Sequence, residues 1–295
     1  TEGQAIIRQL AAQTDVLIEN YKVGGLKKYN LDYESLSAIN PRLVYCSITG
    51  FGQTGPYADR PGYDFLIQGM GGLMSITGEA TDNNGNGGPV RTGVAVTDLF
   101  SGMYAANAIQ GALLERHSSD LGQHIDIALL DVQAAVLANQ ATNYLIGGEV
   151  PGRIGNSHPN IVPYQAFATR DGHLILAVGN DAQFQRFCDV IGEPQLALDS
   201  RYVSNRMRVE NRETLCRQIS EFLKTHNTRD WLQRFEDNHI PCGPINSIDQ
   251  VFDHPQILAR KMQISIIDER AGEVAGVANP INYSRSIIDY AVPPP

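Results

Sequence analysis

The sequence predicts an α/β protein with a parallel sheet in a large domain and a smaller α+β domain. Up to about residue 50, apolar β-branched runs alternate with helical patterns, which is typical of parallel strands joined by helices. After about residue 155, a hairpin pattern and several successive helical patterns replace this alternation. We therefore expect a large domain at 1–158, a small domain at 159–263 and a segment at 264–295 that returns toward the large domain.

The elements of the large domain are predicted from the period of their apolar residues. Residues 1–13 carry Ile6, Ile7 and Leu10 on one face of a helix, and a strand at 16–18 follows. An α/β domain ordinarily begins with a strand, so we expect the chain to start partway through a unit and its closing prolines to fall short of the domain's end. The other elements expected here are a helix at 33–39, a strand at 43–48, a loop-rich stretch at 50–88, a β-rich run at 89–97, a helix at 98–116, a strand at 123–130 and a helix at 132–145.

The small domain is predicted to open with a hairpin. Two apolar runs at 164–168 and 173–178 flank Arg170-Asp171-Gly172, and an Asp-Gly pair is typical of a tight hairpin turn. Helical patterns follow at 181–191, 206–224 and 228–237, and extended structure is expected at 264–289.

Composition disfavours several classes of protein. A net charge of −9 argues against general nucleic-acid binding, so an anionic ligand needs a local basic cluster. No apolar run approaches the roughly 20 residues of a membrane span, and no secretory signal pattern opens the sequence as given. The four cysteines are scattered and form no C-x-x-C pair, which favours free thiols in a reducing compartment. We expect a cytoplasmic protein, or one of the mitochondrial matrix if the source is eukaryotic.

A carboxylate, Asp98, stands where the β-rich run meets the helix at 98–116. The unpaired N–H groups and positive dipole end of that helix favour an ionised carboxylate and also favour negative charge developing beside it. The simpler interpretation is an ordinary N-cap, with Thr97 as the competing cap. The carboxylates considered as nucleophiles are Asp64, Asp98, Asp126 and Asp131, of which the last two are also explained as caps.

Two loops resemble ligand sites. Residues 50–55 fit G-x-G-x-x-G after a strand, but Pro56 and Pro61 break the helix that a dinucleotide site requires, so a tight loop over some other ligand is favoured. Residues 19–28 follow the strand at 16–18, at the strand end where open α/β sheets bind ligands. Three lysines in that loop can hold phosphates, and a solvated surface loop is the equal alternative.

Metal and serine chemistry find little support. The seven histidines show no metal-ligand spacing, and no G-x-S-x-G elbow occurs. We therefore expect no metal. His158, in the loop at 155–160, is the one histidine in a loop of the ligand-facing kind.

Several stretches together resemble the class III CoA-transferase family, also called the CaiB/BaiF or formyl-CoA transferase family. They follow the family's order over essentially the whole chain: residues 15–21, 40–43, 50–57, 60–64, 71–78, 89–91 with 96–98, 122–123, 163–167 and 177–181. The resemblance implies a Rossmann-like large domain, here partial, because the family's first strand and helix would precede Thr1. It also implies a homodimer of interlocked chains, and the family's closing Gly-Glu-His segment would follow Pro295.

The resemblance also implies a mechanism. The family's nucleophile is an aspartate in a Val-x-Asp-x-x-x-Gly setting, which here is Asp98 with Gly102. It attacks an acyl-CoA thioester, and the released CoA thiolate then converts the acyl-aspartyl anhydride to an aspartyl-CoA thioester. The acceptor carboxylic acid reverses these steps, so the partners implied are an acyl-CoA and a free carboxylic acid, with coenzyme A as the group transferred.

Further site residues carry over from the family's motifs. The positions that bind CoA are Asn20, Tyr21, Lys22 and Lys28, where the family often has arginine at the last two. Lysine lacks the bidentate fork of arginine, so phosphate contacts there are those of a point charge. Tyr63 and Asp64 match the pair that lines the thioester site.

The nearest subgroup in appearance moves CoA between dicarboxylates, as succinyl-CoA:glutarate CoA-transferases do. In that reading Arg91 holds the distal carboxylate of the acceptor, or else forms a structural ion pair, and His158 is a second substrate-facing residue. Two alternatives stay open. One is an α-methylacyl-CoA racemase-like isomerase, disfavoured because racemases of this fold carry a histidine base where this chain has Tyr63. The other is a non-catalytic fragment that acts only in assembly.

Overall fold

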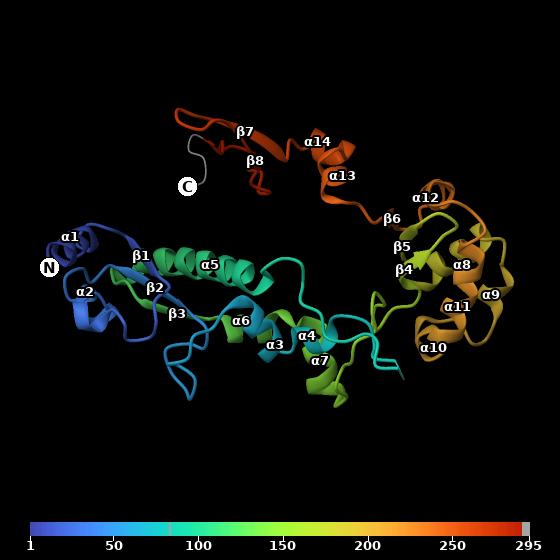
Figure 1. Ribbon diagram of the computed structural model, residues 1–295, viewed down its shortest axis with the longest axis horizontal. Helices are drawn as coiled ribbons and strands as arrows, with labels where there is room; N and C mark the ends of the chain where they lie inside the picture. Colours follow the sequence, from blue (N-terminus) through green and yellow to red (C-terminus); the bar gives the residue numbers. More distant parts are fainter. Residues whose placement is uncertain (83, 291–295) are drawn as a thin grey trace. The chain divides into compact units, whose positions relative to one another are not determined.

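The computed structural model describes residues 1–82 and 84–290, and the chain divides into two compact units, Thr1–Asn156 and Ser157–Pro295 (Figure 1). The fold class is mixed α/β, as predicted: the first unit holds a parallel sheet and the second holds antiparallel sheets. Each unit is described by itself.

The sheet of the first unit has three strands in the order β1-β2-β3. The strands are β1 (Val16–Glu19), β2 (Val44–Thr49) and β3 (His124–Ala128), and both pairs are parallel. The predicted strands at 16–18, 43–48 and 123–130 are therefore confirmed. β2 lies in the middle and is buried along most of its length, which explains its near-continuous apolar run.

Short helices flank this sheet in sequence. The helix α1 (Glu2–Ala11) begins with a capping box in which the Thr1 hydroxyl accepts from the Gln4 amide, and α2 (Tyr33–Ser37) is capped by Asp32. A single 3-10 turn, η1 (Lys27–Tyr29), lies in the lysine-bearing loop. A small core joins Ala11 and Leu36 to three further side chains, Leu31, Leu43 and Tyr45.

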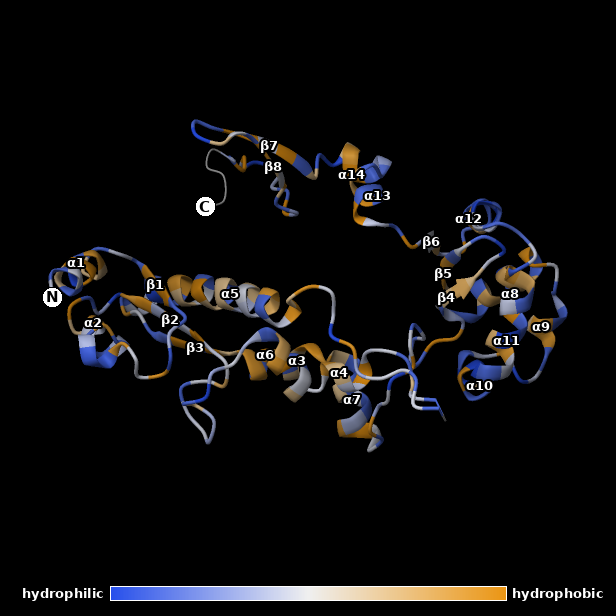
Figure 2. Ribbon diagram, in the orientation of Figure 1, coloured by the Kyte–Doolittle hydropathy of each residue, from blue (hydrophilic) through white to orange (hydrophobic). Residues whose placement is uncertain are grey.

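The longest helix, α5 (Val96–Ser119), is tied to the sheet at its C-terminal end by Arg116. The Arg116 guanidinium forms an ion pair with Asp15 at 2.7 Å and donates to the Arg42 carbonyl at 2.8 Å. Asp15 and Arg42 precede β1 and β2, so the last turn of α5 lies at the amino ends of the strands and its first turn points toward their carboxyl ends. Figure 2 shows hydrophobic residues recurring along α5 between polar ones.

Four further helices complete the first unit: α3 (Asp64–Met70), α4 (Leu73–Ile76), α6 (Leu129–Val136) and α7 (Ala138–Gly147). The stretch at 50–88 was expected to be loop-rich, and α3 and α4 lie within it. The helix expected at 132–145 is instead two helices, which meet at Ala138 with a positive φ of 49°.

The β-rich run expected at 89–97 is not a strand. Residues 89–95 form an irregular segment, and α5 begins at Val96, inside the expected run. β propensity is realised only where a neighbouring strand supplies hydrogen bonds. Here the Thr92 N–H donates to the side chain of Gln68 and the Val90 N–H donates to the Thr77 carbonyl, so no ladder forms.

The second unit begins with the predicted hairpin, β4 (Tyr164–Ala168) and β5 (His173–Ala177), to which β6 (Cys242–Pro244) adds antiparallel. Its helices are α8 (Asp181–Val190), α9 (Gln195–Leu198), α10 (Asn205–Glu210), α11 (Arg212–Leu223), α12 (Thr228–Asp237), α13 (Ile248–Phe252) and α14 (Pro255–Ala259). The helix expected at 206–224 is therefore two, separated at Asn211. A hairpin of β7 (Gln263–Asp268) and β8 (Gly272–Val277) lies in the stretch expected to be extended.

The second unit has one continuous apolar core. Trp231 stacks on Phe235 with ring centroids 5.4 Å apart and donates its indole N–H to the Leu223 carbonyl at 2.8 Å. Phe187 packs against Phe235, and β4, β5 and the helices contribute further buried side chains.

All four cysteines are free thiols, as expected from their spacing. Burial raises the pKa of Cys188 to about 12 and those of Cys216 and Cys242 to about 11. Within the described ranges, no helix combines the length and the apolar character needed to cross a bilayer.

Candidate active site

Two glycines bring the end of β2 against the start of α3. A Cβ on Gly50 would lie 2.5 Å from the Cα of Gly62, so neither residue can carry a side chain without moving the backbone. The Gly50 carbonyl also accepts from the Leu130 N–H, which ties the start of α6 to the same place. Gly50, the first residue of the Gly-rich loop at 50–55, therefore allows the close approach that sets Tyr63 and Asp64 beside the carboxyl end of β2.

Asp64 uses both carboxylate oxygens to join α3 to α5. Its side chain is buried, its Oδ1 accepts from the Thr97 N–H at 2.9 Å, and its Oδ2 accepts from Gln68 Nε2 at 2.7 Å. The residue at the N-cap position of α5 is Ala95, which has no capping side chain. Asp64 therefore caps α5 from a neighbouring helix and supplies an acceptor that local sequence lacks.

Asp98 lies in the first turn of α5 and is exposed. Two interpretations from the sequence are wrong: neither Asp98 nor Thr97 is the N-cap, and the site does not favour the ionised form. Partial desolvation of its carboxyl, with the charge of Asp64 as a further cause, raises the pKa of Asp98 above its ordinary value of 3.8. A partly desolvated carboxylate with a raised pKa is a better nucleophile than one fully hydrated in water.

Tyr63 and Arg91 border the same helix starts. The Tyr63 side chain is 75% exposed, directly before the buried Asp64. The Arg91 guanidinium lies 5.7 Å from the ring centroid of Phe65, so it sits beside the first turn of α3. Among the described residues Arg91 makes no ion pair, which contradicts the structural ion pair considered from the sequence. Its charge is available to an anion.

The loop at 19–28 is joined to the same end of β2. Asn20 Nδ2 donates to the Ile48 carbonyl, two residues before Gly50, and the Tyr21 N–H donates to the Glu19 carboxylate at 2.7 Å. The Asn20 amide thus holds the loop on the sheet. The Lys28 ammonium lies 4.8 Å from the centroid of the exposed Tyr29 ring.

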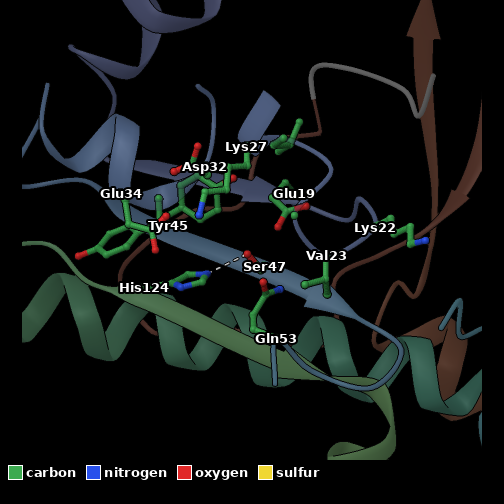
Figure 3. A pocket seen from close by; sticks show the side chains of 13 residues that line it. Glu19, Lys22, Val23, Lys27, Asp32, Glu34, Tyr45, Ser47, Gln53 and His124 are labelled. Carbon is green, nitrogen blue, oxygen red and sulfur yellow. Dashed lines mark hydrogen bonds between the residues drawn. The ribbon is translucent and has the colours of Figure 1, made fainter. Parts of the chain in front are cut away.

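A pocket of about 200 Å³ opens beside this loop (Figure 3). Lys22 and Lys27 line it together with the carboxylates of Glu19, Asp32 and Glu34. In its wall the Ser47 hydroxyl and His124 Nε2 lie 2.9 Å apart, and the His124 ring stacks on Tyr33 with centroids 5.1 Å apart; Figure 3 shows Lys22 directed away from His124. The carboxylates disfavour a phosphate inside this pocket, and Lys28, in the same loop, does not line it.

His158 belongs to the second unit. Its Nδ1 accepts from the Asn160 N–H at 3.1 Å, and its ring lies 5.1 Å from that of Tyr164. Asp126 and Asp131 are also accounted for: Asp126 accepts from the Gln53 N–H at 2.9 Å, and Asp131 is an exposed residue in the first turn of α6. Within residues 1–82 and 84–290, no group of three or more His, Cys, Asp or Glu is arranged to hold a metal ion.

Sequence reasoning missed the glutamines that support the site. Gln68 and Gln133 are both fully buried, and the Thr97 hydroxyl donates to Gln133 Oε1 at 2.7 Å. A signal was available: Asp64 and Gln68 stand at i and i+4, on the face of α3 that also carries the buried Ile67. A polar pair on a buried helix face indicates a hydrogen-bond network.

The chain belongs to CoA-transferase family III, a family of enzymes, whose family model matches residues 1–295. It is 52% identical over 294 residues to a succinate–glutarate CoA-transferase of Agrobacterium fabrum, covering all of this chain and 72% of that protein. It is 42% identical over 294 residues to the human succinyl-CoA:glutarate CoA-transferase, covering all of this chain and 66% of that protein. A solved CAIB/BAIF family structure from Brucella suis matches 97% of this chain and 73% of that one, with a TM-score of 0.80 and 50% identity. The resemblance identified from the sequence is confirmed.

Proposed function

We propose that this protein transfers CoA from an acyl-CoA to a free dicarboxylic acid through an aspartyl-CoA thioester on Asp98. The observation that carries the proposal is the environment of Asp98: an exposed carboxylate whose pKa is raised by desolvation and by Asp64, in the first turn of a helix that Asp64 holds. Such a group is reachable by substrate and poorly stabilised as a free anion.

The reaction proceeds in four acyl substitutions, and each bond that forms is matched by one that breaks, so no further reactant is needed. An Asp98 oxygen attacks the thioester carbonyl carbon, the C–S bond breaks, and CoA leaves as a thiolate. The thiolate attacks the aspartyl carbonyl carbon and releases the donor acid, which leaves Asp98 as a thioester. The acceptor carboxylate then attacks that carbonyl and expels the thiolate, and the thiolate attacks the acceptor acyl carbon and restores the Asp98 carboxylate. Two thioesters of similar energy are exchanged, so no energy input is required.

CoA would bind along the loop at 19–28. Lys22 and Lys28 supply positive charge for its phosphates, Tyr21 supplies an exposed ring, and Asn20 fixes the loop to β2. The carboxyl ends of β1 and β2, where this loop starts, are the ligand-binding edge of an open α/β sheet.

The acceptor is a dicarboxylic acid because Arg91 offers an unpaired guanidinium beside α3. The names of the Agrobacterium and human relatives, succinate–glutarate and succinyl-CoA:glutarate CoA-transferase, support this substrate class. His158 stays a proposed substrate contact, and the interlocked homodimer stays a proposal. Exposed apolar side chains along α5, such as Leu99 and Met103, support a partner surface.

The test is to trap the covalent intermediate. The protein is incubated with succinyl-CoA and hydroxylamine, and the mass of each peptide is measured. We expect an aspartyl hydroxamate on Asp98 in the wild type and in Asp131→Asn, whose exposed carboxylate is the matched control. Asp98→Asn should carry no label and lose transfer by a factor of about 10³ or more. Full transfer activity in Asp98→Asn would overturn the proposal.

A further inference from the structure

Gln68 is the buried side chain that touches both halves of the candidate site. Its Nε2 donates to Asp64 Oδ2 at 2.7 Å, while its Oε1 accepts from the Thr92 N–H at 3.1 Å. Asp64 in turn holds the start of α5 through the Thr97 N–H. Thr92 directly follows Arg91. The Gln68 amide is therefore linked through Asp64 to the turn of α5 that carries Asp98, and through Thr92 to the segment that carries Arg91.

The polar atoms of this amide are used in one orientation only. The Asp64 carboxylate is an acceptor and the Thr92 N–H is a donor, so the Gln68 nitrogen must face Asp64 and the oxygen must face residue 92. The Thr92 hydroxyl lies 3.3 Å from the same oxygen and donates to the Val94 carbonyl at 2.9 Å. Gln68 is fully buried, so no water replaces either bond.

The irregular segment at 89–95 is held by this amide at Thr92 and by the bond from the Val90 N–H to the Thr77 carbonyl. Its residues form no strand, and Arg91 within it is exposed. Without the bond to Gln68, the Thr92 N–H loses the acceptor that fixes the segment over α3. A loosened segment displaces the Arg91 guanidinium, whereas a loosened Asp64 displaces the first turn of α5.

We propose that Gln68 is a positioning residue that couples the Asp98 nucleophile to the acceptor-binding segment at Arg91. The inference rests on the proposed function for the roles of Asp98 and Arg91. Its geometric content, two separable hydrogen bonds from one amide, stands on the contacts alone. The two bonds can be broken separately because they use different atoms.

Three variants separate the two halves. Gln68→Met fills a similar volume and removes both bonds. Gln68→Glu keeps an oxygen that accepts from Thr92 but replaces the neutral amide donor to Asp64 with a second carboxyl, so that the two buried carboxyls share one proton. Gln185→Met, at an exposed position of α8 in the second unit, is the matched control for the loss of an amide. The measurements are kcat, the KM for the acceptor acid, the rate of hydroxamate formation at Asp98 and thermal unfolding.

We expect Gln68→Met to slow hydroxamate formation by about 10- to 100-fold and to raise the acceptor KM several-fold, since small misplacements cost factors of this size. Gln68→Glu should slow hydroxamate formation but leave the acceptor KM within about twofold of the wild type, because its oxygen still holds Thr92. Gln185→Met should match the wild type in every readout. A merely structural role for Gln68 predicts a change in melting temperature with no such split.

Hydrogen exchange of the Thr92 and Thr97 amides tests the geometry without any substrate. Gln68→Met should lose protection at Thr92, and Gln68→Glu should retain it. The proposal is overturned if Gln68→Met behaves like Gln185→Met, or if Gln68→Glu raises the acceptor KM as much as Gln68→Met does. If Gln68→Met does not fold, the Gln68→Glu variant decides alone: its hydroxamate formation should be slowed while its acceptor KM stays near the wild-type value. If the wild type forms no hydroxamate while the exchange pattern holds, the proposed function and the coupling of Asp98 to Arg91 both fail, and only the positioning of residues 92 and 97 by Gln68 and Asp64 is supported.

Discussion

The interiors of the two units differ in kind. The second unit has a continuous apolar core that includes Trp231, Phe187 and Phe235, and each of these side chains is at most 2% exposed. The first unit has a small core around Leu36 and a buried polar network in addition. The network includes Asp64, Gln68, Thr97 and Gln133.

The difference shows what each kind of packing is suited to. An apolar core stabilises without direction, so it tolerates small shifts of its members. Hydrogen bonds fix direction, so a network such as that of Asp64 sets the start of a helix at one place. The first unit, with the candidate nucleophile Asp98, uses such hydrogen bonds at the start of α5, whereas in the described part of the second unit the fully buried polar side chain is Arg208, which donates to the Val162 and Tyr202 carbonyls.

The largest expected effect is in the second unit. Phe235→Ala removes a fully buried ring that packs on Trp231 and Phe187, and should lower the free energy of unfolding by about 3–5 kcal/mol. Denaturant unfolding measures it, with the exposed Ile248 replaced by Ala as the control. If the first unit is independent, hydroxamate formation at Asp98 stays at the wild-type rate under native conditions. If Phe235→Ala lowered both the free energy of unfolding and the rate of hydroxamate formation at Asp98, the two units would not be independent.

Gly62→Ala tests the close backbone approach in the first unit. The new Cβ would overlap Gly50, so the end of β2 and the start of α3 must separate, at a cost of about 1–3 kcal/mol. Hydroxamate formation should fall with stability because Tyr63 and Asp64 follow directly. Gly152→Ala, where a Cβ meets nothing within 4 Å, is the control. If Gly62→Ala and Gly152→Ala had the same stability and the same rate of hydroxamate formation, the close approach of Gly50 and Gly62 would not be needed.

Asp64→Asn tests the electrostatic part of the site. The charge of Asp64 is one cause of the raised pKa of Asp98, so its removal should lower that pKa and shift the acid limb of the kcat/KM profile to lower pH. One of the two donors to Asp64 then faces an amide nitrogen, which should cost about 1 kcal/mol of stability. Asp59→Asn, an exposed carboxylate, should leave the acid limb in place. A shift to higher pH would refute the assignment.

The smallest expected effect is a gain in stability from Asp98→Asn. The pKa of Asp98 is higher in the folded protein than its ordinary value, so the folded state loses stability as pH rises through that pKa and Asp98 ionises. Since the side chain is exposed, removing the charge should gain at most about 0.5 kcal/mol at pH 7. The gain should vanish below the ordinary value of 3.8, where the wild type is protonated as well. Thermal unfolding at both pH values measures it, and a loss of stability at pH 7 would contradict the sign.

Periodicity predicted the regular elements well. The strands β1, β2 and β3 and the β4–β5 hairpin follow from apolar runs and an Asp-Gly turn, because such patterns are local. The strand expected within 89–97 was wrong because Val90, Val94 and Val96 carry β propensity, but in the described part of the chain no strand pairs with this run. Whether a partner strand is present is decided by the fold.

The sequence by itself determined the fold class, the family and the candidate nucleophile, because each follows from the pattern of apolar residues or from the order of motifs along the chain. Only the tertiary structure decided how Asp98 is placed. The cap of α5 is supplied by Asp64, more than thirty residues earlier in the chain, and Asp64 is oriented by the buried Gln68. The pKa of Asp98 depends on how much solvent reaches the carboxyl and on how close Asp64 comes. Burial and through-space charge depend on the positions of residues distant in sequence, so local pattern alone predicted the opposite shift.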